Sequence, residues 1–262
     1  MSHSIYPALF ISHGSPMLVV EQTKTTRFFE SLGEALPIPR AIVIFSAHMD
    51  SRHEVIVTAA EHPHTVHDFY GFPEPLYQLN YPAPGEPNLA QTIASKLSEA
   101  GFPVFLDPKR GWDHGVWMPL MLVYPNANIP IVQVSIDANA GTEYNHRLGK
   151  ALRSLREEEV LMIGSGGISH NLQAYFSPDS LPENEGKVQA FTEWVHRHLE
   201  EGDRDSLLDY QSLAPEADFN HPTQEHFLPL LTILGTSDGK EIRRIHSDLD
   251  NRVLALDAYQ FS

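Results

Sequence analysis

The chain has 262 residues, with 34 Asp or Glu against 18 Lys or Arg, which gives a formal net charge of −16. This charge argues against nucleic acid and anionic membrane surfaces as partners, because both are bound through clustered Lys and Arg. The chain has 15 histidines and no cysteine, so any metal site must use imidazole, carboxylate and water as ligands.

Short apolar runs alternate with amphipathic segments, which is the pattern of an α/β protein. The expected elements, in chain order, are a strand at 8–13, a helix at 22–36, strands at 41–48 and 54–60, a helix at 89–100, a strand at 103–107, a helix at 116–124, a strand at 129–136, a helix at 143–158, a strand at 160–164, helices at 184–201 and 223–234, and strands at 241–246 and 253–261. This order predicts one domain over residues 1–262, with a central, partly parallel sheet and helices on both faces.

The segment 61–87 is rich in Pro, His, Gly and aromatic residues and is expected to be a long ordered loop with a functional role. No apolar run approaches the roughly 20 residues that cross a bilayer. The first ten residues also lack the basic start and apolar stretch of a signal peptide. We therefore expect a cytoplasmic protein that binds no membrane.

Histidines recur at the ends of predicted strands. His13 and His48 end the strands at 8–13 and 41–48, and His170 follows the strand at 160–164. Because ligands of open α/β sheets bind beyond the carboxyl ends of the strands, these three side chains are expected to converge. A single histidine at such a place is commonly a hydrogen-bonded structural residue, but two beside small residues favour a ligand site.

Two further histidines are candidates for the same site. His226 is expected in the first turn of the helix at 223–234, and His114 in a turn before the helix at 116–124. Either of them can equally be a buried structural histidine. The loop histidines His62, His64 and His67 are more simply explained as solvated residues.

Several short motifs, taken in order, resemble the class III (LigB-like) extradiol ring-cleavage dioxygenases, and most closely the 4,5-DOPA extradiol branch of that family. The motifs are His13-Gly14-Ser15-Pro16, Ser46-Ala47-His48, His67-Asp68-Phe69 with Gly71-Phe72-Pro73, Tyr81-Pro82-Ala83-Pro84-Gly85, Trp112-Asp113-His114-Gly115, Ser165-Gly166 with His170-Asn171, and Glu225-His226-Phe227-Leu228-Pro229-Leu230. They extend from residue 8 to about residue 235 and so cover most of the chain.

The resemblance implies a three-layer αβα fold around a mixed sheet and a mononuclear non-haem metal site. It implies His13, His48 and His226 as metal ligands, His170 as the active-site acid and base, and His114 as a histidine that contacts the substrate or supports a ligand. Better-known members of the wider family use a Glu as third ligand. Glu225 is therefore the alternative to His226, and His170 is a possible fourth ligand.

The expected activity is cleavage of a catechol ring with O₂, with DOPA opened at the 4,5 bond to a seco-DOPA semialdehyde. Fe(II) is the metal expected for activity, and Zn(II) is plausible in the isolated protein. The expected partners are a small catechol and O₂, with the chain as a monomer or small homo-oligomer. Two alternatives stay open at this point: a zinc hydrolase on the same scaffold, and a non-enzymatic protein that binds metal through its histidines.

Overall fold

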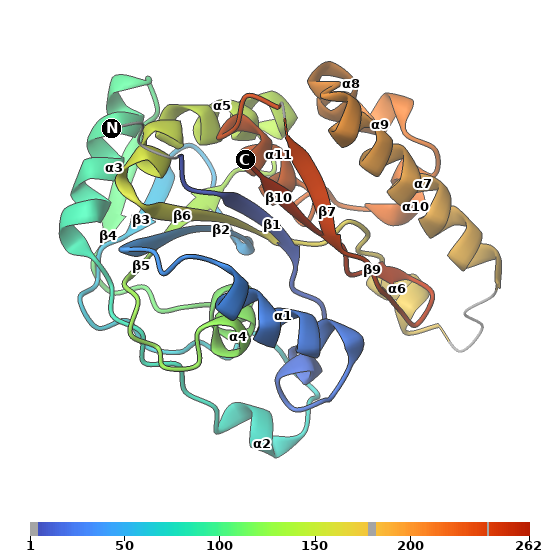
Figure 1. Ribbon diagram of the computed structural model, residues 1–262, viewed down its shortest axis with the longest axis horizontal. Helices are drawn as coiled ribbons and strands as arrows, with labels where there is room; N and C mark the ends of the chain where they lie inside the picture. Colours follow the sequence, from blue (N-terminus) through green and yellow to red (C-terminus); the bar gives the residue numbers. More distant parts are fainter. Residues whose placement is uncertain (1–4, 178–181, 240) are drawn as a thin grey trace.

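One eight-stranded sheet forms the centre of the computed structural model, which describes residues 5–177, 182–239 and 241–262 (Figure 1). The strands are β1 (Ala8–Ser12), β2 (Ala41–Asp50), β3 (Val55–Thr58), β4 (Val104–Asp107), β5 (Ile131–Ile136), β6 (Val160–Gly166), β7 (Ile242–His246), β8 (Leu249–Asp250), β9 (Leu254–Ala255) and β10 (Ala258–Phe261). Across the sheet their order is β4-β3-β5-β2-β6-β1-β10-β7, and β8 pairs with β9 in a separate ribbon.

The four central strands β5, β2, β6 and β1 are parallel to one another, whereas β3 pairs antiparallel with β5, and β10 pairs antiparallel with β1 and β7. The sheet is therefore mixed and largely parallel, as predicted. Parallel strands covered on both faces are apolar throughout, which explains the continuous runs Ile42–Phe45 and Val160–Ile163. All of these residues are buried.

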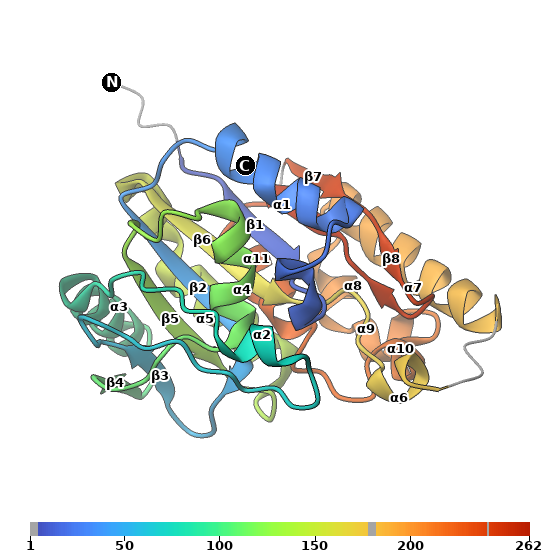
Figure 2. The ribbon, with the colours of Figure 1, turned by 90° about the horizontal axis from the view of Figure 1, so that it is seen from below.

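Helices cover both faces of the sheet (Figure 2). The helices are α1 (Lys24–Ala35), α2 (Glu74–Tyr77), α3 (Pro87–Glu99), α4 (His114–Val123), α5 (Gly141–Leu152), α6 (Leu172–Tyr175), α7 (Pro182–Glu201), α8 (Arg204–Leu208), α9 (Tyr210–Leu213), α10 (Ala217–Asn220) and α11 (Leu228–Gly235), with 3-10 turns η1 (Pro16–Val19) and η2 (Arg153–Glu158). Among the helices of the described residues, none is long and apolar enough to cross a bilayer.

Two cores lie on opposite faces of the sheet. Side chains alternate between the faces along each strand, so Leu9 belongs to the core that includes residues of α1 and α4, while its neighbour Phe10 belongs to the core that includes residues of α3, α5, α7 and α11. Figure 1 shows α1 and α4 below the sheet, α5 and α11 above it, and α3 at its left end beside β3 and β4. These three layers are the αβα architecture that the resemblance implied.

The helix expected at 223–234 is shorter than predicted, because α11 begins only at Leu228. Pro229 lies in its first turn, where a proline is tolerated because the missing amide proton has no partner there in any case. The preceding residues form hydrogen-bonded turns, with the Phe227 and Leu228 amides donating to the Gln224 carbonyl. His226 therefore lies in a turn before the helix, and the prediction that it sits in the first helical turn is wrong.

Other helices and strands also begin or end at residues that differ from the predicted ones. Strand β2 continues two residues beyond His48, so this histidine lies inside the strand rather than at its end. The expected helix at 143–158 ends at Leu152 and continues as the 3-10 turn η2. The expected strand at 253–261 is interrupted at residues 256–257, because β9 pairs with β8 and only β10 joins the main sheet.

Candidate metal centre and its cavity

Five histidines from distant segments lie together at the carboxyl end of the central strands. His13 follows β1, His48 lies near the end of β2, His170 lies four residues beyond β6, His114 begins α4, and His226 precedes α11. The ring centroids of His13 are 4.9 Å from His48, 5.5 Å from His114 and 5.5 Å from His226. The ring of His170 stacks on that of His226 at 3.3 Å.

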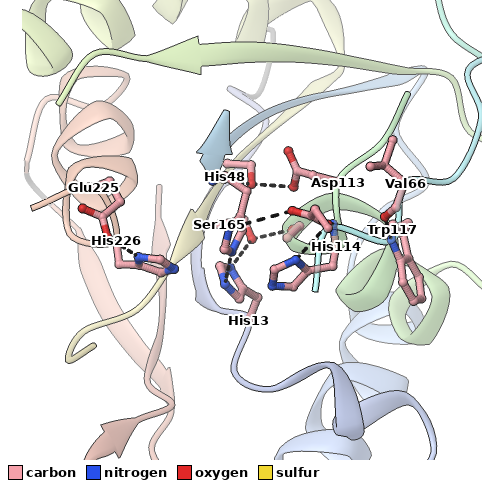
Figure 3. A network of polar contacts seen from close by, with 12 residues as sticks. His13, His48, Val66, Asp113, His114, Trp117, Ser165, Glu225 and His226 are labelled. Carbon is pink, nitrogen blue, oxygen red and sulfur yellow. Dashed lines mark hydrogen bonds and ion pairs between the residues drawn. The ribbon is translucent and has the colours of Figure 1, made fainter. Parts of the chain in front are cut away.

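Three imidazoles turn ring nitrogens toward one point (Figure 3). Nε2 of His13 and Nε2 of His48 are 3.1 Å apart, and one ligand atom from each of His13, His48 and His226 lies within 4.8 Å of the others. Nε2 of His226 is buried and has no hydrogen-bond partner among the described residues. A buried polar atom without a partner lowers the stability of the fold. A divalent metal bound by the three nitrogens would be that partner for Nε2 of His226.

Hydrogen bonds at the far side of two rings set which nitrogen carries the proton. Oγ of Ser165 donates to the Gly115 carbonyl, so it accepts from Nδ1 of His13, 3.0 Å away. Oε1 of Glu225 lies 3.0 Å from Nδ1 of His226 and accepts its proton. In both rings Nε2 is left with its lone pair directed into the site, as in metal-binding histidines whose other nitrogen is held by a hydrogen bond.

Asp68 connects the aromatic loop to the histidine cluster. Its Oδ1 accepts the backbone amide of His114 at 2.9 Å and lies 3.0 Å from Nδ1 of the same residue. Its Oδ2 is 3.9 Å from Nδ1 of His48. Although burial alone would raise the pKa of Asp68, its contacts with His114 lower it to about 2, so the carboxylate is charged at neutral pH.

Burial keeps the imidazoles of His13, His48, His170 and His226 neutral. It lowers the pKa of His48 to about 3 and that of His170 to about 4. For His13 and His226, burial followed by repulsion from neighbouring histidines holds the pKa well below the usual range. Neutral imidazoles have the lone pairs that a metal or a transferred proton requires.

Two glycines allow the segments to approach closely. A Cβ atom at Gly166 would lie 2.2 Å from the His226 carbonyl, and one at Gly115 would lie 2.5 Å from Oγ of Ser46 and 3.1 Å from Cδ2 of His48. Side chains at these positions would push the His226 turn and the start of α4 away from the site. The end of β6 and the start of α4 are thus places of close backbone approach.

The histidines form the floor of a cavity of about 380 Å³. Its walls come from the Gly14–Pro16 turn, the aromatic loop at Phe69, Tyr70 and Phe72, helix α6, and residues 254–256. The predicted loop at 61–87 therefore contributes a wall of the cavity, although residues 74–77 within it form the short helix α2. A planar aromatic molecule fits such a space.

Sequence reasoning missed several residues that hold the site in place. Asp68, Ser165 and Asp113 belong to the motifs that carry the resemblance, but the motifs alone indicated no role for these three side chains. Asp113 is buried beside the site, where it accepts hydrogen bonds from Ser46 and Gln133. The loop histidines lie elsewhere: Nε2 of His67 contacts the Leu79 carbonyl at 3.0 Å, and among the described residues none of His62, His64 and His67 belongs to a cluster of potential metal ligands.

Comparison with known proteins identifies the class to which this fold and site belong. Residues 7–252 match the family described as the catalytic LigB subunit of aromatic ring-opening dioxygenases, and the chain belongs to this family. The protein is therefore a non-haem metal-dependent extradiol dioxygenase.

Individual relatives agree with this assignment. The chain is 42% identical to a protein of Escherichia coli named 4,5-DOPA dioxygenase extradiol, over 92% of this chain and 89% of the relative. It is 36% identical to a protein of Beta vulgaris with the same name, over 99% of this chain and 97% of that relative. A crystal structure of an uncharacterised Escherichia coli K12 protein superposes with a TM-score of 0.81 at 35% identity, covering 98% of this chain and all of the other.

Proposed function

We propose that His13, His48 and His226 hold one Fe(II) ion, and that the enzyme opens a catechol ring beside its two hydroxyl groups. The single observation that carries this proposal is the convergence of three imidazoles at the floor of a cavity, where the buried Nε2 of His226 has no hydrogen-bond partner in the part of the chain that the structure describes. We assign His226 rather than Glu225 as third ligand, because the Glu225 carboxylate already accepts the Nδ1 proton of His226.

Bound Fe(II) would supply positions for both catechol oxygens and for O₂, and would acidify a bound hydroxyl group. The residues around it then move protons. His170 is neutral and lines the cavity next to His226, so it can accept a catechol proton and return it later. Nδ1 of His114 lies beside the charged Asp68. This carboxylate favours a proton on that nitrogen, and it holds the imidazole of His114 in the orientation in which the ring faces His48.

The relatives named for DOPA make DOPA the first substrate to test, with 4,5-cleavage to a seco-DOPA semialdehyde as the expected reaction. The protein should be loaded with Fe(II) without oxygen and then given DOPA or other catechols in air. We expect O₂ uptake and a yellow ring-opened product, and no turnover with Zn(II) in the same site. Absence of O₂ uptake with every catechol, or turnover of esters or amides with Zn(II), would contradict the proposal.

We also propose that the chain works as one catalytic domain over residues 1–262. The argument for it is that segments bordering a single sheet contribute all five histidines. A cytoplasmic location and a monomeric or small homo-oligomeric state remain predictions, which fractionation of cells and measurement of the mass in solution would test.

A further inference from the structure

His221 is a buried histidine that the proposed function does not use. It follows α10 and is 4% exposed, and its ring centroid lies 5.5, 6.1 and 5.1 Å from those of the buried residues Phe191, Tyr210 and Phe227. Its Nε2 is 2.7 Å from the Ile168 carbonyl oxygen. Because a carbonyl oxygen only accepts, Nε2 carries the proton and donates it. Packing against three rings restricts rotation of the imidazole, so the direction of this hydrogen bond is fixed.

The imidazole of His221 is not explained by packing alone. Burial lowers the pKa of His221 to about 4, so the ring is neutral at pH 7 and has one proton. That proton is on Nε2, and the buried Nδ1 has no hydrogen-bond partner among the described residues. A buried acceptor without a partner lowers stability, and an apolar side chain in the same place would avoid this loss. The feature that only the imidazole brings is its donor to the Ile168 carbonyl.

Three hydrogen bonds join the turn at 168–171, which carries His170, to the segment 219–221. In these bonds Nε2 of His221 donates to the Ile168 carbonyl, the His170 amide donates to the Asn220 carbonyl at 2.8 Å, and Nδ2 of Asn171 donates to the Phe219 carbonyl at 2.7 Å. On the other side of the turn, the Ser169 hydroxyl donates to the Val253 carbonyl. The turn is therefore held from two sides, and His221 supplies the side-chain donor on the side of α10.

The place of the His170 imidazole depends on this turn. The ring stacks on that of His226 at 3.3 Å with an angle of 6° between the planes. Stacking fixes the separation of two rings but lets them slide past each other, so the backbone decides where the His170 ring lies in its own plane. For a group that takes up or returns a proton, a shift of about 1 Å can lower the rate by about 10²-fold.

We propose that His221 is a positioning residue for His170, which it places beside the substrate by holding the Ile168 carbonyl. This inference rests on the proposed role of His170 in proton transfer. His221 does not itself line the catalytic cavity among the described residues. Its effect on the reaction therefore passes through the turn at 168–171.

Two variants of His221 separate the hydrogen bond from the packing. His221→Leu removes the donor, whereas His221→Gln keeps an amide N–H that can reach the same carbonyl. With the Fe(II)-loaded protein and a catechol in air, we expect His221→Leu to lower kcat by about 10- to 100-fold, with KM and metal content changed by less than about twofold. His221→Gln should recover most of kcat. A raised KM with full kcat, or no recovery in His221→Gln, would overturn the inference.

His246→Leu is the matched control for a general loss of stability. His246 is also a buried histidine with a hydrogen bond at Nε2, but it lies on β7 and does not line the cavity. We expect His246→Leu to lower the midpoint of urea unfolding, as His221→Leu does, and to leave kcat unchanged. Equal losses of kcat in the two leucine variants would show that lost stability is the cause, and would refute the positioning role.

Amide hydrogen exchange tests the same contact without turnover, in the Zn(II)-loaded protein. We expect the amides of 168–171 to exchange faster in His221→Leu and at the original rate in His221→Gln, because local opening is governed by such contacts. If the unchanged protein consumes no O₂ with any catechol, the proposed function fails, and faster exchange in His221→Leu would still support the hold of His221 on the turn. Unchanged exchange in His221→Leu would overturn the inference even if kcat falls.

A measurement on the unchanged protein does not depend on the folding of any variant. The ¹⁵N chemical shifts of His221 in the Zn(II)-loaded, diamagnetic protein at pH 7 report which ring nitrogen carries the proton, and so replace an assignment from geometry by an observation. We expect the proton on Nε2. A proton on Nδ1 would leave Nε2 without a hydrogen to donate to the Ile168 carbonyl and would overturn the inference.

Discussion

The carboxylate of Glu225 lies 3.0 Å from Nδ1 of its neighbour His226 and accepts the proton of that nitrogen. His226 thus faces the proposed metal, and Glu225 holds the imidazole of His226 in place. The arrangement depends on the turn before α11, in which consecutive side chains can meet. In a regular helix they would point about 100° apart, given 3.6 residues per turn.

We expect the two residues of this pair to respond differently to substitution. His226→Ala should lose nearly all bound metal, because the site is left with two ligands. Glu225→Gln should keep the metal and weaken its binding by about 10- to 100-fold, as is usual for a residue that orients a ligand. Titration of metal into the apoprotein measures both, and Glu99→Gln on the exposed side of α3 is the control. Full metal binding by His226→Ala would make Glu225 the third ligand.

Ser165 should affect metal binding through His13. Ser165→Ala removes the acceptor of the Nδ1 proton, so the ring can rotate or change tautomer. We expect metal affinity to fall by roughly 10- to 100-fold, with a smaller effect on the thermal midpoint. Ser135→Ala is the matched control, since the hydroxyl of that buried serine accepts the Ile56 amide and, among the described residues, forms no hydrogen bond with the five histidines. Equal losses of metal affinity in the two variants would show that Ser165 has no specific role.

His170 is expected to act on the reaction and not on the metal. His170→Gln should retain metal at the level of the unchanged protein and lower kcat by about 10²- to 10⁴-fold, the usual contribution of a general acid or base. His62→Gln in the exposed loop is the control. Metal content and single-turnover rates should be measured on the same preparations. Retention of full turnover would remove His170 from the mechanism, and loss of metal would make it a fourth ligand.

Asp68 and His114 should be energetically coupled. Asp68→Asn keeps an oxygen that can accept the His114 amide but removes the charge beside Nδ1. We expect kcat to fall by roughly tenfold in this variant. In the double variant with His114→Gln the losses should be clearly less than additive, because both changes disturb one interaction. Additive losses in the double-mutant cycle would contradict a shared role.

His246 is expected to make the fold sensitive to acid at a place remote from the metal centre. Its ring stacks on Phe28 at 4.3 Å, and its Nε2 donates to Oγ1 of Thr25, which donates to Asp248. Burial lowers the pKa of His246 to about 4 from its ordinary value of 6.5, with Lys24 lowering it further and Asp248 opposing the shift. The folded protein therefore binds the proton less readily than the unfolded chain.

The sign of the pH effect follows from this difference. Neutral His246 makes its full contribution to the free energy of unfolding above about pH 6.5. This contribution is lost as the pH falls toward 4, and the loss is about 2 kcal/mol once solvent screening is allowed for. Urea unfolding at pH 7 and pH 4.5 measures the change. His246→Gln should reduce the difference between the two pH values, and a variant with an unchanged difference would refute the assignment.

The sequence alone determined the fold class and the region of the site. Apolar runs such as Val160–Ile163 predict buried parallel strands, because the covering of both faces leaves no position for polar side chains. Once the strands are parallel, residues just beyond their carboxyl ends must share one edge. For this reason the convergence of His13, His48 and His170 was predictable from positions far apart in the chain.

Tertiary structure decided how those residues are held and what the cavity offers a substrate. The contact of Ser165 with His13 joins residues 152 positions apart, and that of Asp68 with His114 depends on the path of a long loop. Likewise, only the fold gathers Tyr70, Leu172 and Phe176 at one opening. Local periodicity specifies strands and helices, but ring tautomers, hydrogen-bond partners and the lining of a cavity depend on how segments pack. That packing is set by contacts between residues that no local pattern relates.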